Sequence, residues 1–334
     1  MTKAREIHLV TRPTGLPEAD HFRLVETELP ALQDGQVLVN NLYMSVDPYM
    51  RGRMRENAVY AAAYELNKVM YGGAVGTVTE SRASGLQPGD VVLSQCGWRD
   101  RFVADAGTIE RIEPLDRDHL SWYLGTLGMP GMTAWVGLLK LGEPKPGATV
   151  FVSAASGAVG ANVCQIARIK GCRVVGSVGS DAKAAWLREE CGADAVINYR
   201  TCGDLTAALA EAAPEGIDVY FENVGGDHLQ AALANMKPFG RIVACGMIQT
   251  YNNAQPAAGP NNLMLIVGKK LRIQGFIVSD YMDLQDQFRN DMQEWIKSGR
   301  IKTRETVIDG LDNAVGAFLQ LFSGGNFGKM VVKI

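Results

Sequence analysis

The sequence has little of what a hydrolase, a metalloenzyme or a membrane protein usually carries. Its four histidines and six cysteines are scattered, and no Cys-x-x-Cys pair is present, so it lacks the signature of a zinc ribbon or a dithiol redox site. It also has no Gly-x-Ser-x-Gly segment and no Gly-x-x-x-x-Gly-Lys phosphate loop. The most apolar stretch, residues 263–267, is far shorter than the ~20 residues that a membrane helix needs.

Neither sign of charge dominates the chain. The 33 Lys+Arg and 36 Asp+Glu residues give a net charge of −3, which argues against nucleic-acid binding because phosphates require a basic field. The charged N-terminus leads into no apolar run and so does not read as a secretory signal. With scattered cysteines typical of reduced, buried thiols, these features predict a cytoplasmic protein without a nucleic-acid or membrane partner.

Two regions of different character make up the 334 residues. Residues 1 to about 120 are mostly strand and turn, with a β-rich run at 36–43 and another strand at 91–94 after a Pro-Gly-Asp turn. Helical periodicity is scarce there, which predicts a β-rich domain. The chain then passes through an apolar, helix-like segment at 122–141 and a break at 143–147.

Strand and helix patterns alternate after this break. The expected strands are 148–153, 173–178, 195–198, 218–221, 240–245 and 271–275, and the expected helices between them are 159–170, 182–190, 205–212 and 228–236. Six strands alternating with helices predict a parallel sheet covered on both faces, an α/β doubly wound Rossmann fold. Helices at 283–298 and 313–322 follow, and we expect the final strand, 329–334, to return to the first domain.

The turn after the first of these strands has the pattern of a phosphate-binding site. Ala154, Gly157 and Gly160 fit Ala-x-x-Gly-x-x-Gly between a strand and a helix. Gly157 allows close approach of a pyrophosphate, Gly160 allows tight packing of the helix on the strand, and the helix start supplies amide donors. Small-residue turns also serve packing alone, but the strand–turn–helix context favours a dinucleotide.

The end of the second strand favours NADP over NAD. An NAD site usually has an acidic residue there, whereas this sequence has Val178, which leaves room for a 2′-phosphate. Lys183 could pair with that phosphate, and Tyr199 could pack on the adenine or donate its hydroxyl. The alternatives are a solvated lysine and an ordinary edge tyrosine. Asp181 could cap the following helix or bind the ribose.

Taken together, the motifs resemble a known family nearly end to end. They lie at residues 45–54, 127–135, 154–160, 179–183, 198–199, 222–226, 245–251 and 326–329. The chain is similar to the zinc-independent branch of the medium-chain dehydrogenase/reductase superfamily, and to its leukotriene/prostaglandin and curcumin reductase group of NADPH-dependent alkenal reductases. The resemblance implies a GroES-like catalytic and substrate domain, residues 1–123 and 302–334, beside a Rossmann NADP-binding domain, residues 124–301.

No metal is expected. Zinc-dependent members of the superfamily carry Gly-His-Glu where this chain has Tyr71, Gly72, Gly73 and Ala74. The cluster of structural cysteines is missing as well, so neither zinc site of those enzymes has its ligands in this sequence.

The resemblance also implies site residues. The expected NADPH contacts are Gly157, Ala158, Val159, Gly160, Lys183, Tyr199, Asn223, Cys245, Gly246, Met247, Ile248, Tyr251, Phe276, Ile277, Val278 and Asn326. Tyr251 is the leading hydrogen-bond donor to the substrate carbonyl, because a neutral tyrosine can donate to a developing enolate. Tyr49 is the second catalytic candidate, with a structural turn residue as the alternative reading. Asn223 could mark only a turn, and residues 276–278 only a core or interface strand.

These residues imply a reductase that transfers a hydride from NADPH to the β-carbon of α,β-unsaturated ketones or aldehydes. A quinone reductase of the same superfamily is the first alternative, and a non-catalytic NADPH-binding regulator is the second. The substrate is a small molecule. Because the last Rossmann strand would leave an apolar edge, we expect a homodimer that pairs this edge across a two-fold axis.

Overall fold

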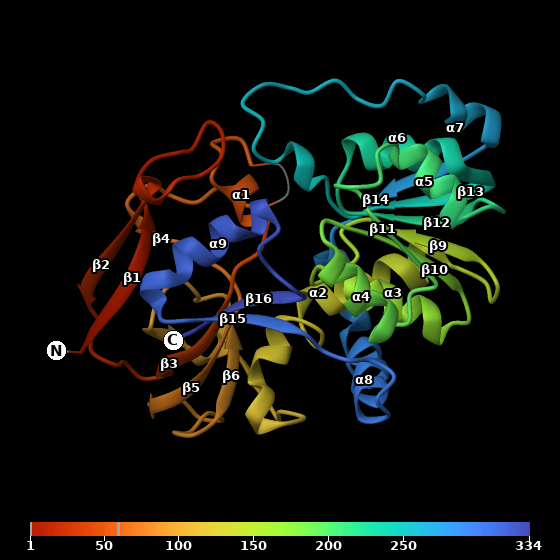
Figure 1. Ribbon diagram of the computed structural model, residues 1–334. Helices are drawn as coiled ribbons and strands as arrows, with labels where there is room; N and C mark the ends of the chain where they lie inside the picture. The colour runs from red at the N-terminus through yellow and green to blue at the C-terminus, as the bar shows by residue number, and fades with distance from the viewer. Residues whose placement is uncertain (1, 59–60) are drawn as a thin grey trace. The chain divides into compact units, whose positions relative to one another are not determined.

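The computed structural model describes residues 2–58 and 61–334, and the chain separates into two compact units. One unit contains residues 1–124 and 305–334, so it draws on both ends of the chain, and the other contains residues 125–304. The two units are coloured along the chain in Figure 1.

A six-stranded parallel sheet forms the centre of the second unit. Its order is β11-β10-β9-β12-β13-β14, and the strands are β9 (Thr149–Val152), β10 (Arg173–Val178), β11 (Ala195–Asn198), β12 (Ile217–Glu222), β13 (Met236–Ala244) and β14 (Arg272–Gly275). Every residue of β9 is buried, as expected for a central parallel strand covered on both faces. This order is that of the doubly wound dinucleotide-binding fold, which confirms the fold class expected from the sequence.

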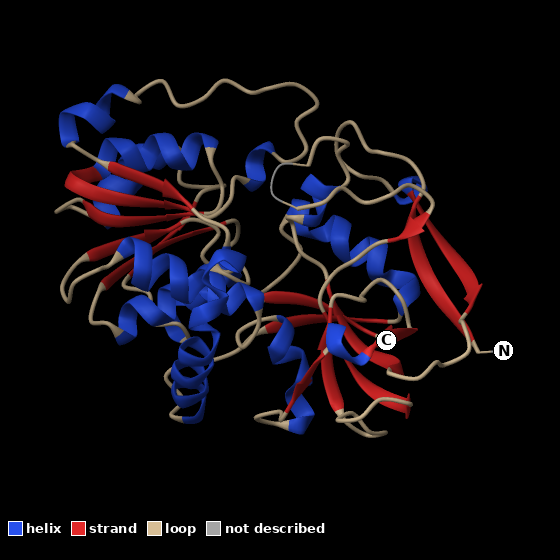
Figure 2. Cartoon of the chain, turned by 180° about the vertical axis from the view of Figure 1, so that it is seen from behind, coloured by secondary structure: helices blue, strands red, loops and turns tan. Residues whose placement is uncertain are grey.

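Helices cover both faces of this sheet, with α5 and α6 on one face and α3 and α4 on the other (Figures 1 and 2). They are α3 (Gly160–Ile169), α4 (Asp181–Glu189), α5 (Leu205–Ala212) and α6 (Gly226–Asn235). The unit also contains α2 (Met129–Val136), η4 (Gly137–Gly142), η5 (Ile248–Thr250), α7 (Met264–Lys269), η6 (Val278–Leu284) and α8 (Gln285–Lys297). Apolar side chains from α5 and α6 pack on the sheet around the stacked rings of Phe151 and Tyr220.

The first unit is built around a seven-stranded sheet and a smaller three-stranded sheet. In the larger sheet β15-β16-β3-β5-β6-β8 are neighbours and β7 also pairs with β3, while the smaller sheet has the order β2-β1-β4. The strands are β1 (Lys3–Leu9), β2 (Phe22–Glu28), β3 (Gln36–Ser45), β4 (Lys68–Val69), β5 (Ala74–Ser81), β6 (Val91–Ser94), β7 (Arg101–Asp105), β8 (Glu110–Ile112), β15 (Glu305–Asp309) and β16 (Lys329–Lys333). The C-terminal strand β16 pairs antiparallel with β3.

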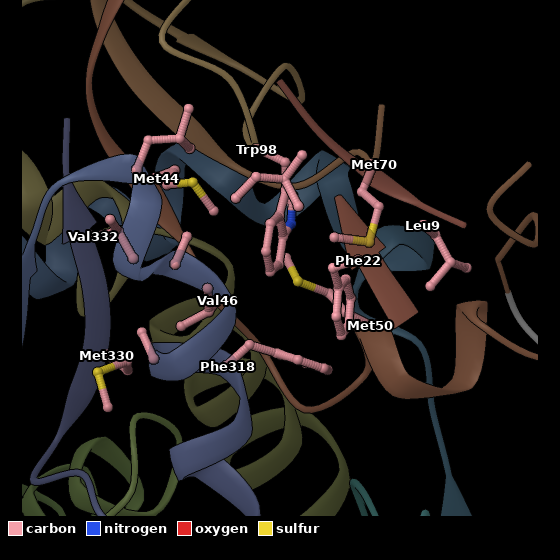
Figure 3. Close-up of a cluster of buried hydrophobic side chains, with 14 of the residues drawn as sticks. Leu9, Phe22, Met44, Val46, Met50, Met70, Trp98, Phe318, Met330 and Val332 are labelled. Atoms are coloured by element: carbon pink, nitrogen blue, oxygen red, sulfur yellow. The ribbon is translucent and has the colours of Figure 1, made fainter. Parts of the chain in front are cut away.

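Short helices complete the first unit and enclose an apolar core. They are η1 (Ala19–His21), α1 (Met50–Arg53), η2 (Ala106–Thr108), η3 (Arg117–Leu124), η7 (Leu311–Asn313) and α9 (Ala314–Ser323). Trp98 lies at the centre of the core, stacked near Phe22 and edge-on to Phe318 of α9 (Figure 3). The core therefore joins the N-terminal strands to the C-terminal helix, and it explains why both chain ends are needed for this unit.

Candidate cofactor and active site

The glycine turn lies between β9 and α3, at the carboxyl edge of the six-stranded sheet. Ala154 has a φ of +48°, an unusual value for a residue with a side chain, and its carbonyl accepts a hydrogen bond from the Gly157 amide at 2.9 Å. A Cβ on Gly160 would lie 2.4 Å from the Ala154 oxygen and 2.8 Å from the Ala155 Cα. Only glycine therefore fits where the helix meets the strand.

The start of α3 is open to an anionic ligand. Its N-cap, Val159, makes no side-chain capping hydrogen bond. The backbone amides of Ala158, Val159 and Gly160 belong to this helix start, where the helix dipole favours negative charge. The cradle formed by the glycine turn and the uncapped helix thus fits the pyrophosphate of a dinucleotide.

Two basic side chains meet at the ends of β10 and β11. Lys183 is buried in the first turn of α4, and burial lowers its pKa, with the nearby Arg200 adding to the effect. The Arg200 Nε would lie 3.3 Å from a Cβ on Gly179. Val178 places no carboxylate at the end of β10. Because two cations held together favour an anion between them, the pair fits a 2′-phosphate. Arg200 was not predicted from the sequence, although it directly follows Tyr199.

Asp181 does not cap α4. The N-cap is Ser180, whose Oγ accepts the Lys183 amide at 3.4 Å. Asp181 instead accepts a hydrogen bond from Asn198 Nδ2 at 2.8 Å. Ser180 is the N-cap residue because it directly precedes the first helical residue and has extended backbone angles, the conformation that capping requires.

Tyr199 packs against a buried histidine that the sequence did not single out. Its ring meets the His228 ring edge-on at a centroid distance of 5.2 Å, and its hydroxyl would lie 2.7 Å from a Cβ on Gly179. Burial lowers the pKa of His228 to about 4. The Nε2 atom of His228 has no hydrogen-bond partner among the described residues. A neutral imidazole from α6 therefore supports the tyrosine that follows β11.

Asn223 is pinned to the end of β9, beside the glycine turn. Its backbone amide donates to Ser153 Oγ at 2.9 Å, and its side-chain Nδ2 donates to the Ser153 carbonyl at 2.8 Å. The residue before it, Glu222, is completely buried at the end of β12. Glu222 was not predicted as a site residue, because a carboxylate within a strand–turn motif gives no sign of its burial.

The loop that follows β13 carries Tyr251 back to the sheet. The amides of Cys245 and Gly246 donate to the Glu222 carbonyl at 2.9 and 3.1 Å. A Cβ on Gly246 would lie 2.9 Å from the Tyr251 hydroxyl, so the hydroxyl rests on the backbone at the carboxyl end of β13. Burial raises the pKa of Tyr251. The hydroxyl therefore stays protonated at neutral pH and can donate a hydrogen bond.

The remaining predicted contacts of the second unit differ in exposure. Met247 and Ile277 are exposed, and Ile248 and Val278 are half-buried. Phe276, after β14, turns inward, since a Cβ on Gly137 would lie 2.8 Å from its Cζ. Phe276 and Ile277 thus link β14 to η6, which begins at Val278, and the ring of Phe276 packs on the protein.

Two predicted residues, Tyr49 and Asn326, lie in the first unit. Tyr49 precedes α1 and packs on the apolar core of that unit, after a segment fixed by the buried Lys329–Asp47 ion pair at 3.0 Å. Asn326 donates from Nδ2 to the Gly328 carbonyl at 2.9 Å. The other predicted residues lie around the carboxyl ends of the strands of the six-stranded sheet, and the roles of all of them, like those of Tyr49 and Asn326, stay predictions.

The described residues contain neither a group of metal-ligating side chains nor a helix suited to a membrane. Across residues 2–58 and 61–334, no three His, Cys, Asp or Glu side chains are grouped so that they could hold a metal ion. In the same residues, no helix combines the length and apolar character that crossing a bilayer demands.

Comparison with known proteins places both units in known families. Residues 5–112 match the family described as the N-terminal domain of oxidoreductase, and residues 158–298 match the family described as zinc-binding dehydrogenase. The second description names zinc, whereas the described residues of this chain contain no group of three His, Cys, Asp or Glu side chains that could hold a metal ion.

Full-length relatives have reductase names. The chain is 41% identical to NADPH-dependent curcumin reductase from Escherichia coli over 98% of this chain and 95% of the relative. It is 42% identical to prostaglandin reductase 1 from Bos taurus over 100% of both chains. It is also 42% identical to the NADP(+)-dependent 2-alkenal reductase from Nicotiana tabacum, over 99% and 97%.

A solved structure has the same fold throughout. The structure of CurA from Vibrio vulnificus in complex with NADPH is 40% identical, covers 98% of each chain and gives a TM-score of 0.94. This agreement extends over both units of the chain.

Proposed function

The chain belongs to the curcumin, prostaglandin and 2-alkenal reductase group of the medium-chain dehydrogenase/reductase superfamily, and on that premise we propose how its residues perform the reaction. It is an NADPH-dependent oxidoreductase that reduces the carbon–carbon double bond of α,β-unsaturated ketones and aldehydes. The observation that carries this conclusion is identity of about 40% over the full length to reductases of such compounds.

We propose that the glycine turn and the first three strands hold the adenine half of NADPH. The amides at the start of α3 bind the pyrophosphate, and Gly160 allows the helix to come close enough. Lys183 and Arg200 pair with the 2′-phosphate, and the Tyr199 hydroxyl, held over Gly179, adds a donor. This set distinguishes NADPH from NADH by two positive charges and one hydrogen-bond donor.

We assign the chemical step to the second half of the sheet. When bound, NADPH supplies a hydride to the β-carbon of the substrate. Negative charge then develops on the carbonyl oxygen, where Tyr251 donates a hydrogen bond from its protonated hydroxyl. The resting place of this hydroxyl on Gly246 fixes the donor in advance, so little reorganisation is needed during the reaction. Asn223, Met247, Ile248 and residues 276–278 complete the cofactor contacts.

In this proposal the first unit supplies Tyr49 and Asn326 to the substrate and cofactor. The buried pair of Lys329 and Asp47 supports the turn before Tyr49, which makes Tyr49 a rigid contact. Replacement of Tyr49 by Phe tests whether its hydroxyl takes part. A lower kcat supports a catalytic role, and an unchanged kcat with a lower melting temperature indicates a purely structural one.

The activity is tested by loss of NADPH absorbance with a panel of enones, enals and quinones, including 3-nonen-2-one. We expect oxidation of NADPH with enones and enals. Turnover confined to quinones would indicate the quinone-reductase alternative. Binding of NADPH without oxidation by any compound would indicate the non-catalytic regulator.

We also propose a homodimer formed at β14. This strand ends the sheet, and Ile273 on it is 40% exposed. On the preceding helix α7, Met264 is 84% and Val267 is 79% exposed, so this helix also presents apolar side chains to solvent. Unpaired strand edges with apolar side chains favour pairing. Light scattering is expected to give twice the chain mass of 36.1 kDa, and Ile273→Asp is expected to shift the protein toward monomer. A wild-type monomer would contradict this assignment.

A further inference from the structure

Glu222 is a buried acid that has no role in the reaction proposed above. Its carboxyl group is completely buried at the end of β12. The Oε1 atom accepts the amides of Val224 and Gly225 at 2.6 and 2.8 Å and the Ser153 hydroxyl at 3.2 Å. The Oε2 atom has no hydrogen-bond partner among the described residues. Three donors converging on one oxygen suit a carboxylate rather than a neutral acid.

No basic side chain is among the groups that act on this carboxyl. Burial raises its pKa, and only hydrogen bonds oppose that effect. A buried charge without a counter-ion is expensive to maintain, and a plain loop anchor would work as well with a neutral amide. A positively charged partner would offset this cost, and the described residues place no basic side chain beside the carboxyl. The partner is therefore expected to be a bound ligand.

The position of Glu222 in the fold indicates where that partner lies. In a doubly wound sheet of this order, the two halves each bind one nucleotide across the carboxyl ends of the strands. The glycine turn and Lys183 lie in the half formed by β9, β10 and β11, which takes the adenine nucleotide. The half formed by β12, β13 and β14 then takes the nicotinamide, and Glu222 ends its first strand.

Glu222 also holds the loops on which the nicotinamide contacts lie. Its backbone carbonyl accepts the amides of Cys245 and Gly246, and its side chain fixes the loop that follows Asn223. Any group held by Asn223 and residues 245–251 is therefore close to the buried carboxyl group of Glu222.

We propose that Glu222 is a positioning residue whose negative charge makes the enzyme bind NADP+ in preference to NADPH. The inference rests on the proposed function. Loss of the hydride, with its electron pair, to the substrate leaves one additional positive charge on the nicotinamide. A fixed negative charge near the bound nicotinamide would stabilise the oxidised form and the positive charge that develops as the hydride departs. Glu222 acts through the electric field of its carboxylate and through the loops that it holds after β12 and β13, without contacting the cofactor.

The test is the ratio of two dissociation constants, measured on the full-length protein by calorimetric titration with NADP+ and with NADPH. In Glu222→Gln we expect the affinity for NADP+ to fall roughly tenfold more than the affinity for NADPH, the effect of one unit charge in partly screened surroundings. Glu222→Asp keeps the charge and is expected to keep the wild-type ratio, even if both affinities fall because the loops move.

Glu305 offers a matched control. It is another carboxyl whose pKa burial raises, and it accepts a hydrogen bond from the Ser121 hydroxyl at 2.5 Å, in the first unit. Glu305→Gln should leave the ratio unchanged. If Glu222→Gln weakens both nucleotides equally, Glu222 only shapes the loops and the inference is wrong. If the wild-type protein binds neither nucleotide, the proposed function itself fails.

The wild-type protein provides a second readout that does not depend on how a variant folds. The groups that face Glu222 are Tyr220 on its own strand, Ser153 after β9 and Cys245 after β13. Burial raises the pKa of Cys245 to about 12 and raises the pKa of Tyr220 well above its ordinary value, so neither titrates between pH 5 and 8. Because the 2′-phosphate is common to both nucleotides, its titration cancels in the ratio.

The preference for NADP+ is therefore expected to fall as pH is lowered and Glu222 gains a proton, beginning above the range of an ordinary glutamate because its pKa is raised. A ratio that does not change with pH from 8 to 5 in the wild-type protein would overturn the inference. Where Glu222→Gln folds, its ratio should stay flat over the same range.

Discussion

The two halves of the six-stranded sheet end in opposite chemistry. At the carboxyl ends of β9, β10 and β11 lie a glycine turn, an open helix start and the cationic pair Lys183 and Arg200. At the ends of β12 and β13 lie a buried carboxyl, Glu222, and the protonated hydroxyl of Tyr251. The first half is suited to phosphates. The second is suited to a nicotinamide ring that becomes positive and to a substrate carbonyl oxygen that becomes negative.

This difference indicates that recognition and chemistry are separable along a single sheet edge. In the proposed function, groups in the first half bind phosphates that do not change during the reaction, so they would contribute uniform binding. Groups in the second half would face charges that appear only as the hydride moves, so they would act on the rate. Substitutions in the two halves should then move different kinetic constants.

The largest effect is expected at Tyr251. In Tyr251→Phe, loss of one hydrogen bond to the developing enolate should lower kcat roughly 100- to 1,000-fold, while the dissociation constant for NADPH changes little. Steady-state kinetics with an enone and a direct binding titration measure the two quantities. Tyr123→Phe is the control, because that hydroxyl bonds to the Leu115 amide in the first unit. Undiminished turnover in Tyr251→Phe would remove the tyrosine from the chemical step.

Acid should destabilise the folded chain at His228, whose neutral ring packs on Tyr199 after β11. Its pKa is about 4 in the folded chain and ~6.5 when unfolded, so the neutral form is the one that folding favours. This stability is fully present above pH 6.5 and is lost as pH falls toward 4, by up to about 3 kcal/mol. Urea unfolding at several pH values should show that His228→Phe, which keeps a ring beside Tyr199, has a smaller loss.

The surface histidine His119 is a control for this pH effect, since its side chain is exposed. His119→Gln should lose stability in acid as the wild-type protein does. If His228→Phe shows the full wild-type loss, the buried imidazole does not carry the effect.

Removal of the cationic pair should change cofactor choice and leave the chemistry intact. In the double variant Lys183→Ala, Arg200→Ala, the dissociation constant for NADPH should rise about 10- to 100-fold, because hydrogen bonds to charged groups are the strong ones. Affinity for NADH should be unchanged, and kcat at saturating NADPH should stay close to wild type. Lys170→Ala, at the opposite end of α3, is the control. Equal weakening of both nucleotides would contradict the assignment to the 2′-phosphate.

The smallest effect is expected at Gly246. A Cβ there would lie 2.9 Å from the Tyr251 hydroxyl, so Gly246→Ala should displace the donor by a few tenths of an ångström and lower kcat about tenfold. Gly268→Ala is the matched control, because no atom lies within 4 Å of its Cβ position. If kcat is the same in both variants, the placement of the hydroxyl on Gly246 does not matter for the reaction.

Much of the fold could be predicted because its signals are local. The strands β10 (Arg173–Val178) and β11 (Ala195–Asn198) have the bounds that their apolar runs predict. Strand β13 begins at Met236 rather than at 240, because Met236 pairs with Ile217 before a register shift that alternation does not reveal. The start of α6 at Gly226 was missed because glycine favours turns.

The candidate site was predictable to a lesser degree. The glycine turn has a spacing motif, and the structure places it at the sheet edge as expected. Glu222, Arg200 and His228 were missed because their importance comes from burial and from neighbours distant in sequence: Ser153 for the acid, Lys183 for the arginine and Tyr199 for the histidine. No local pattern encodes these contacts.

The fate of deuterium from NADPH labelled at nicotinamide C4 shows directly which bond is reduced. With an enone as substrate, we expect one deuterium on the β-carbon of a saturated ketone, while the α-carbon takes its proton from water. Deuterium on the carbonyl carbon of an unsaturated alcohol, or none in the product, would contradict the claim that this chain delivers a hydride to a polarised carbon–carbon double bond.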